Sequence, residues 1–100
     1  MLYHGIEFDQ VTIGEFCRRH QVARLSLYGS ILRDDFRPDS DIDVLVEFSP
    51  DARVSLFDLG GMLMDLRDML GREVDLRTPN DLSRHFREQV MREATPLYAA

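Results

Sequence analysis

Cysteine, glycine, proline and long apolar runs are all scarce in this sequence, which has one Cys, six Gly, four Pro and no Trp. The lone Cys17 cannot form an internal disulfide, so we expect a reducing, cytoplasmic compartment. No window approaches the ~18 apolar residues of a membrane span, and the first residues lack the basic patch and apolar run of a signal peptide. We therefore expect a protein that is neither exported nor embedded in a membrane.

Basic residues are also in deficit, because 12 Lys and Arg stand against 18 Asp and Glu, which gives a net charge of -6 at pH 7. That charge repels the phosphate backbone and argues against general nucleic-acid binding. A hydrophobic content of 44% and a charged content of 30% are typical of a folded globular protein. The length of 100 residues predicts a single domain spanning residues 1–100.

Apolar residues at helical spacing predict two helices in the first three quarters of the chain. Thr12 and Glu15 have the spacing of a capping box, which predicts a helix over residues 12–20. Farther along, leucines recur at steps of three and four in a single stripe that Gly71 ends. This stripe consists of Leu56, Leu59, Leu63, Leu66 and Leu70. It predicts a second helix that covers a sheet.

Segments rich in β-branched residues, or alternating loosely with period two, predict three strands. The predicted strands cover residues 22–28, 42–48 and 73–78. After them, Leu82, Phe86 and Val90 give a last helix its inner face. Because strands and helices alternate, we expect an α/β fold in which helices cover a small sheet.

Asp41 and Asp43 are separated by one residue at the start of the second predicted strand. Side chains at i and i+2 of a strand point to the same face, so the two carboxylates share one small volume. Like charges this close repel and destabilise the fold unless a cation neutralises them. Oxygen ligands without a nearby His or Cys favour Mg²⁺, or Mn²⁺ in its place, over Zn²⁺. We therefore expect a divalent metal site at these residues.

Asp75 is a third candidate ligand, because it lies in the third predicted strand between the apolar residues Val74 and Leu76. In a two-metal arrangement, one ion holds a triphosphate. The other ion, bridged by Asp41 and Asp43 and reached by Asp75, activates an attacking hydroxyl. Asp75 can also serve as the general base. The alternative is that these acids are ordinary solvated residues of strands.

Gly29 and Ser30 form a turn after the first predicted strand. Glycine lets the backbone approach a ligand closely, so the turn can present main-chain amides and a hydroxyl to a phosphate. Arg33, Arg37 and Ser40 follow in the same loop and are further candidate phosphate ligands, the arginines through their guanidinium groups. Alternatively, both arginines pair with acids of this loop, and Ser40 only braces the turn.

The same residues carry a family resemblance. Tyr28-Gly29-Ser30, followed after residues 31–40 by Asp41-Ile42-Asp43, resembles the pattern of the minimal nucleotidyltransferases (MNT proteins) of the DNA-polymerase-β-like nucleotidyltransferase superfamily. The resemblance covers nearly the whole chain from Val22 onward and includes residues 55–59, 71–76 and 92–98. Ile31 and Asp34 depart from the commonest family loop, which has arginine and glycine at these positions.

This resemblance implies a palm-like mixed sheet with Asp41, Asp43 and Asp75 as catalytic metal ligands. It also implies Mg²⁺ as cofactor, a nucleoside triphosphate such as ATP as substrate, and transfer of a nucleotidyl group with release of pyrophosphate. MNT proteins resemble the antitoxins of pairs whose toxin is a small helical HEPN ribonuclease. In such pairs the antitoxin resembles an AMP transferase acting on a toxin tyrosine, so a HEPN-type partner is expected.

The short chain leaves almost no room for a separate acceptor-binding domain. The acceptor surface then belongs to another protein, to a second copy of the chain in a homo-oligomer, or to a substrate that fits an open cleft. Three functions follow: AMP transfer to a protein, masking of a toxin by contact alone, and nucleotidyl transfer to a small molecule. We expect the first, because the carboxylate triad argues against pure masking and the missing acceptor domain argues against a small-molecule enzyme.

Overall fold

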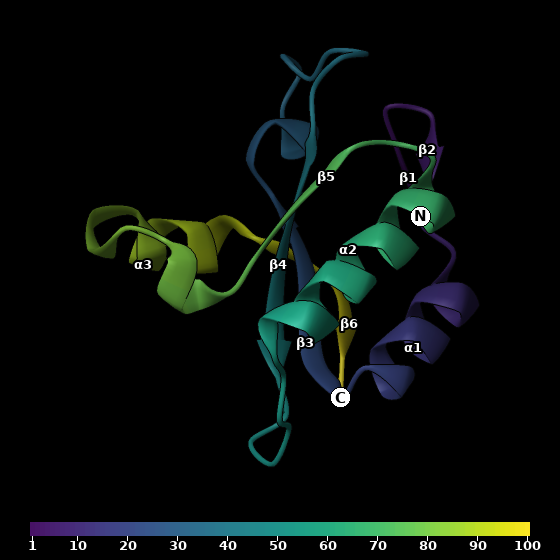
Figure 1. Ribbon diagram of the computed structural model, residues 1–100. Coiled ribbons are helices and arrows are strands. Elements are labelled where there is room, and N and C mark those ends of the chain that lie inside the picture. Colours follow the sequence, from purple (N-terminus) through teal and green to yellow (C-terminus); the bar gives the residue numbers. More distant parts are fainter.

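The computed structural model describes all residues, Met1–Ala100, and contains a mixed sheet with helices on both faces (Figure 1). The strands of this sheet are β3 (Val22–Tyr28), β4 (Ile42–Phe48), β5 (Val74–Arg77) and β6 (Thr95–Ala99). Their spatial order is β5–β4–β3–β6. β3 is antiparallel to both β4 and β6, whereas β4 is parallel to β5. The three predicted strands and the small mixed sheet are confirmed.

The two central strands, β3 and β4, separate an apolar face of the sheet from a polar one. Ile42, Val44 and Val46 are fully buried on one face of β4, whereas Asp43 and Glu47 alternate with them and are only partly buried. Successive side chains of a strand point to opposite faces, so the two carboxylates lie on the second face. The sheet therefore has a polar side on which a ligand can bind.

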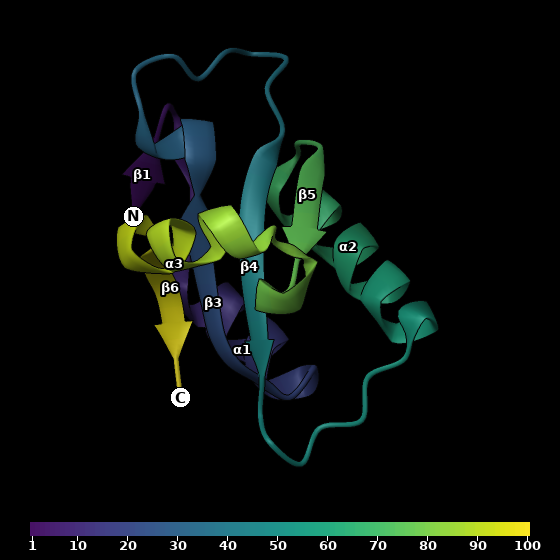
Figure 2. The ribbon, with the colours of Figure 1, turned by 90° about the vertical axis from the view of Figure 1, so that its left-hand side faces the viewer.

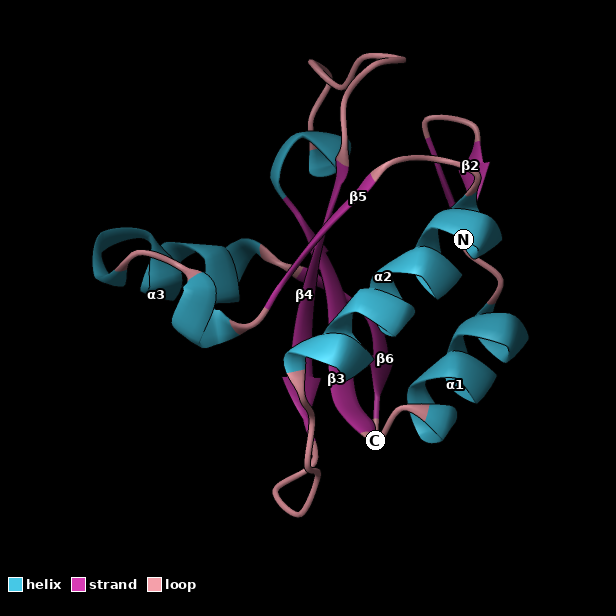
Figure 3. Cartoon of the chain, in the orientation of Figure 1, coloured by secondary structure: helices cyan, strands magenta, loops and turns pink.

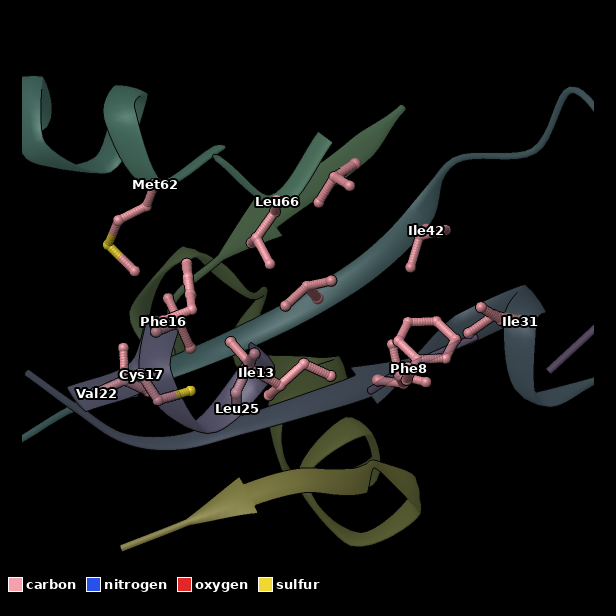
Figure 4. Packing of buried hydrophobic residues seen from close by; sticks show 14 residues of the cluster. Phe8, Ile13, Phe16, Cys17, Val22, Leu25, Ile31, Ile42, Met62 and Leu66 are labelled. Atoms are coloured by element: carbon pink, nitrogen blue, oxygen red, sulfur yellow. The ribbon is translucent and has the colours of Figure 1, made fainter. Parts of the chain in front are cut away.

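Helices α1 (Gln10–Arg19) and α2 (Leu56–Leu70) cover the apolar face of the sheet (Figures 1 and 3). Between them lies the hydrophobic core, which consists of side chains from both helices, the strands and the N-terminal segment (Figure 4). Cys17 is part of it, and burial raises the pKa of its thiol to about 12. The cysteine is therefore a small buried apolar residue and a poor nucleophile.

The first helix begins earlier than the sequence predicted. Asp9 is its N-cap, and the Asp9 carboxylate accepts hydrogen bonds from the Thr12 amide at 3.0 Å and the Thr12 hydroxyl at 2.6 Å. The predicted cap at Thr12 is therefore wrong, because an ionised carboxylate three residues upstream is a stronger acceptor for the free amides of the first turn.

The second helix is where the leucine stripe placed it. Ser55 and Asp58 form its capping box, and Gly71, with φ of 65°, ends it in the left-handed conformation. The stripe itself is only partly right, because Leu66 is buried together with Met62, whereas Leu56 is 86% exposed. The side chains in the first turn of α2 project into solvent, so the row of buried residues on this helix begins farther along.

Helix α3 (Arg84–Glu93) lies on the opposite face of the sheet from α1 and α2 (Figure 2). Its predicted inner face is only partly right, because Leu82 is buried but precedes the helix, Val90 is half-buried, and Phe86 is 61% exposed. The polar residue Arg87 attaches the helix instead. Its guanidinium donates to the Pro79 carbonyl at 2.8 Å and the Leu82 carbonyl at 3.1 Å, in and next to the 3-10 turn η2 (Pro79–Asp81).

Two parts of the fold have no counterpart in the sequence-based prediction. One is the edge strand β6, which pairs with β3 through a register shift and contains Pro96. The other is a hairpin of two-residue strands, β1 (Leu2–Tyr3) and β2 (Ile6–Glu7). No helix of the protein combines the length and apolar character needed to cross a membrane.

Candidate active site

The central strands and β5 place three of the predicted site residues side by side. Gly29 follows β3 directly and begins the 3-10 turn η1 (Gly29–Leu32). In the strand register, Asp43 of β4 lies between Tyr28 of β3 and Asp75 of β5. Residues paired across adjacent strands project to the same face, so both carboxylates share the polar face of the sheet. The Gly29 turn and the carboxylates of Asp43 and Asp75 are thus adjacent at one end of the sheet.

Gly29 is the point of closest approach between the turn and the acids. Its φ of 77° lies in the left-handed region, which glycine adopts without strain. A Cβ at this position would collide with the Oδ2 atom of Asp43. The absence of a side chain therefore allows the Asp43 carboxylate to lie directly against the backbone of the turn.

The local environment disfavours the ionised form of Asp43. Burial, reinforced by the negative charges of Asp75 and Asp41, raises the pKa of the Asp43 carboxyl to about 6, although Arg77 and Arg33 act in the opposite direction. Two or more carboxylates held together in a half-buried site repel each other, and a bound cation removes that repulsion. Asp43 is therefore the electrostatic centre of the candidate site.

Asp43→Asn is expected to stabilise the metal-free protein at about pH 8 and to have little effect at about pH 4.5. A folded-state pKa raised above the unfolded value means that the unfolded chain loses its proton first, so wild-type stability falls as pH rises through about 6. After allowance for solvent screening, we expect a gain on the order of 1 kcal/mol at the higher pH. Urea unfolding at both pH values measures it, and an equal effect at both would contradict this assignment.

Asp75 already has a cationic partner. Its two carboxylate oxygens accept hydrogen bonds from Arg77 Nε at 3.2 and 3.3 Å, and Arg77 Nη2 lies 3.2 Å from Oδ2. This hydrogen bond raises the pKa of Arg77. The arginine was missed in the sequence, although residues i and i+2 of a strand share a face, so the segment Asp75-Leu76-Arg77 carries the signal.

Asp41 is less closely integrated than the other two acids. It precedes β4 and is exposed to solvent, although its charge still reaches Asp43. No three Asp, Glu, His or Cys side chains converge closely enough to enclose a metal ion. Asp43 and Asp75 nevertheless fit a hard divalent cation, because they are oxygen ligands on one face whose mutual repulsion a cation would relieve.

The loop residues proposed as phosphate ligands have other partners in this structure. Arg33 Nε donates to Asp35 Oδ1 at 3.1 Å, so Arg33 pairs within the loop. The Ser40 hydroxyl accepts the Arg37 amide at 3.0 Å and so braces the turn. Arg37 lines a cavity that does not include Gly29. The structure thus brings Gly29, Ser30, Asp43 and Asp75 to one end of the sheet and leaves Arg37 and Ser40 in a separate part of the loop.

A stack of side chains that the sequence did not reveal supports the loop between the turn and the acids. Arg72 donates from Nη2 to the Arg37 carbonyl at 3.1 Å and to the Ser40 carbonyl at 2.8 Å. Its guanidinium lies over the Phe36 ring, 4.9 Å from the ring centroid. The centroids of the Phe36 and His4 rings are 4.8 Å apart. His4 Nε2 in turn contacts the Ile31 carbonyl in η1 at 3.0 Å. We name these three side chains, His4, Phe36 and Arg72, the loop brace.

Arg72→Gln is expected to loosen the loop and destabilise the fold by about 1–2 kcal/mol, because it removes two hydrogen bonds to the main chain and a cation–π contact. Trypsin should then cleave faster after Arg33 in the loop, whereas the Arg37–Pro38 bond resists trypsin in both proteins. Arg67→Gln is the matched control, since Arg67 forms only an exposed ion pair with Glu73. Equal cleavage rates in the two variants would show that the brace does not restrain the loop.

Tyr28 is another residue of the site that the sequence did not identify as functional. It is the cross-strand neighbour of Asp43. Burial has the largest effect on the pKa of the Tyr28 hydroxyl and, together with the charges of Asp43 and Asp75, raises it to about 12. The hydroxyl therefore stays protonated beside the acids and can donate a hydrogen bond.

This fold and this arrangement of a glycine turn and paired acids define a nucleotidyltransferase palm. The chain matches the nucleotidyltransferase domain family over residues 10–98, so the protein belongs to this family and is a nucleotidyltransferase. A protein of Methanocaldococcus jannaschii, named provisionally as a protein adenylyltransferase, is 38% identical over 76 residues. That alignment covers 76% of this chain and 80% of the relative.

Solved structures agree with the family assignment. A structure described provisionally as a minimal nucleotidyltransferase is 36% identical to this chain and has a TM-score of 0.73. The match covers 87% of each of the two chains. A tri-AMPylated Shewanella oneidensis HEPN toxin in complex with an MNT antitoxin gives a TM-score of 0.63 at 20% identity, over 91% of this chain and 70% of that one. At that identity the likeness concerns the fold. The resemblance to minimal nucleotidyltransferases is confirmed.

Proposed function

We propose that the protein transfers AMP from ATP, with Mg²⁺, to a tyrosine hydroxyl of a HEPN-type toxin, and that it acts in this way as an antitoxin. The observation that carries the proposal is the contact of the Gly29 turn with Asp43, with Asp75 on the adjacent strand. A turn that can bind phosphate thus lies beside paired acids, as nucleotidyl transfer requires. The provisional name of the archaeal relative and the AMPylated toxin in the Shewanella complex support AMP as the group and a protein as the acceptor.

The Gly29-Ser30 turn is the proposed binding site for the triphosphate. Because Gly29 has no side chain and a left-handed backbone, the turn can direct amide groups and the half-buried Ser30 hydroxyl at phosphate oxygens. Arg33 is exposed and pairs only with Asp35, so it can exchange this partner for a phosphate. These groups hold the nucleotide with its α-phosphate close to Asp43.

The acids are the proposed ligands of Mg²⁺, with Mn²⁺ as a substitute. Asp43 and Asp75 would hold the ion, and Asp41 would join them from the exposed start of β4. The ion supplies charge neutralisation for the triphosphate and for the leaving pyrophosphate. Arg77, which now neutralises Asp75, would then pair with Asp75 less closely.

Asp75 is the proposed general base of the transfer. Its carboxylate lies on the polar face next to Asp43, where an acceptor hydroxyl can approach it. The acceptor hydroxyl gives its proton to Asp75 while its oxygen forms a bond to the α-phosphorus of ATP. The bond from that phosphorus to the oxygen bridging the α- and β-phosphates breaks, and pyrophosphate leaves with the bonding electrons. The products are the acceptor carrying AMP on oxygen, pyrophosphate and one proton.

The proposal is tested with a small helical protein of the HEPN type as the acceptor. Both proteins are incubated with α-labelled ATP, with and without Mg²⁺, and analysed by mass spectrometry. We expect an AMP-sized increment on a tyrosine of the helical protein, only when Mg²⁺ is present. Neutralisation of the partner without any increment would favour masking by contact. Labelling of added small-molecule hydroxyls in preference to the protein would favour the small-molecule enzyme.

A further inference from the structure

We propose that the cavity between η1 and α3 binds the base of the nucleoside triphosphate, with the Phe86 ring as its stacking surface. This inference rests on the proposed function. The cavity has a volume of about 460 Å³, within the range of ~300–1,000 Å³ usual for small-molecule sites. Tyr28 and Gly29 line one side of it, and Phe86 and Val90 line the other.

The position of the cavity connects it to the candidate active site. Of the four cavities in the protein, it alone is lined by the glycine of the phosphate turn. Tyr28 belongs both to the cavity wall and to the register pair with Asp43. A nucleotide whose phosphates contact Gly29 therefore has its nucleoside within reach of this cavity.

The far wall of the cavity provides an apolar surface that the fold itself does not use. Phe86 is 61% exposed, and α3 buries none of its own residues. Single exposed apolar side chains are common, but Phe86 lines the cavity that Gly29 also lines, so a ligand there would gain free energy by covering its ring. Val90 of the same wall is partly buried, as is Leu32 of η1 on the opposite side of the cavity. A planar base can cover the Phe86 ring and exclude water from it.

The polar edge of the cavity favours a base over two other occupants, which are the ring of an acceptor tyrosine and the triphosphate of the nucleotide. The Gln89 amide donates from Nε2 to Glu93 Oε1 at 3.2 Å, which leaves its carbonyl oxygen and one N–H free. A donor beside an acceptor matches the edge of a base, whereas the ring of an acceptor tyrosine has only one polar atom. Arg33 lines the cavity together with Gly29 and attracts phosphate, whereas Glu93 on α3 repels it, so the triphosphate end of the nucleotide is favoured at Gly29.

The test compares binding of ATP and of inorganic tripolyphosphate, which has no base, by calorimetry. Phe86→Ala is expected to weaken ATP binding about 5- to 150-fold, the range of base–aromatic stacking, and to leave tripolyphosphate binding unchanged. Phe86→Trp should keep ATP affinity. Phe57→Ala is the matched control, since Phe57 is also exposed, at 91%, but lies on α2 across the sheet. It should change neither affinity.

The outcomes separate the base site from the proposed function. Wild-type protein that binds neither ATP nor tripolyphosphate contradicts the nucleotide site as a whole. Wild-type protein that binds both, with unchanged ATP affinity in Phe86→Ala, overturns the base site alone. Phe86→Ala that keeps its ATP affinity but raises the KM for the protein acceptor assigns the cavity to the acceptor ring and also overturns the proposal. Equal weakening of ATP and tripolyphosphate binding would overturn it as well, because the loss would not concern the base.

Discussion

Asp75→Asn is expected to slow single-turnover AMP transfer about 10²–10⁴-fold while changing ATP affinity far less. The reason is the order of the strands. Asp43 lies next to the Gly29 turn, but β4 separates Asp75 on β5 from Gly29, which follows β3. Asp75 is therefore placed to meet the acceptor hydroxyl rather than the triphosphate. Loss of a contact made mainly in the transition state lowers kcat and kcat/KM together.

Asp65→Asn is the matched control for this prediction. Asp65 is also a partly exposed carboxylate, which pairs with the Arg19 guanidinium at 3.8 Å and lies 3.1 Å from His20 Nε2, but it is on α2. Either substitution breaks an exposed ion pair, and each should change stability by less than ~1 kcal/mol. Single-turnover transfer of labelled AMP is measured beside equilibrium ATP binding. A rate loss in Asp65→Asn as large as that in Asp75→Asn would assign the effect to net charge.

The sequence predicted the strands of the site well because their signals are local. The run of β-branched residues in β4 is buried on one face in any packing of this sheet, and the period of two then places Asp43 on the other. The turn at Gly29 follows directly from the end of β3. The local sequence pattern was therefore enough to predict that Gly29 and Asp43 lie close together.

The parts that the sequence did not predict depend on contacts between distant segments. The loop brace joins His4, Phe36 and Arg72, and no local spacing relates these three residues. Helix α3 has an amphipathic pattern, but Arg87 attaches it through main-chain carbonyls, and Phe86 stays 61% exposed beside a cavity. Periodicity indicates which face of a helix is apolar, but it cannot tell whether protein or a ligand covers that face.

The pairing of Asp75 with Arg77 changes the chemical interpretation of the acids. From the sequence, the carboxylates form a purely anionic cluster that needs a metal ion. In the structure, an arginine on the same strand already neutralises one of them. The fold therefore tolerates the paired acids without a metal, and a bound cation competes with Arg77 for Asp75. Metal affinity should accordingly rise when Arg77 is replaced by a neutral residue.

Gly29→Ala is expected to lower both stability and catalysis, and the two effects have separate causes. Alanine in the left-handed conformation that Gly29 adopts, with φ of 77°, costs about 1–2 kcal/mol of stability. The new Cβ also collides with the Asp43 carboxylate, which must move away from the turn. Displacement of a reacting group by ~1 Å can cost about 10²-fold in rate, so AMP transfer should fall by at least that factor.

Gly71→Ala separates the strain from the collision. Gly71 ends α2 with φ of 65°, but a Cβ there would meet no atom within 4 Å. Both variants should therefore lose similar stability in urea unfolding, while only Gly29→Ala should lose AMP transfer and ATP affinity. Equal transfer rates in the two variants would show that Asp43 can shift without harm, and that the contact between the turn and this acid is not needed for the reaction. A rate loss confined to Gly29→Ala would assign the effect to the position of the carboxylate, because the backbone strain is present in both proteins.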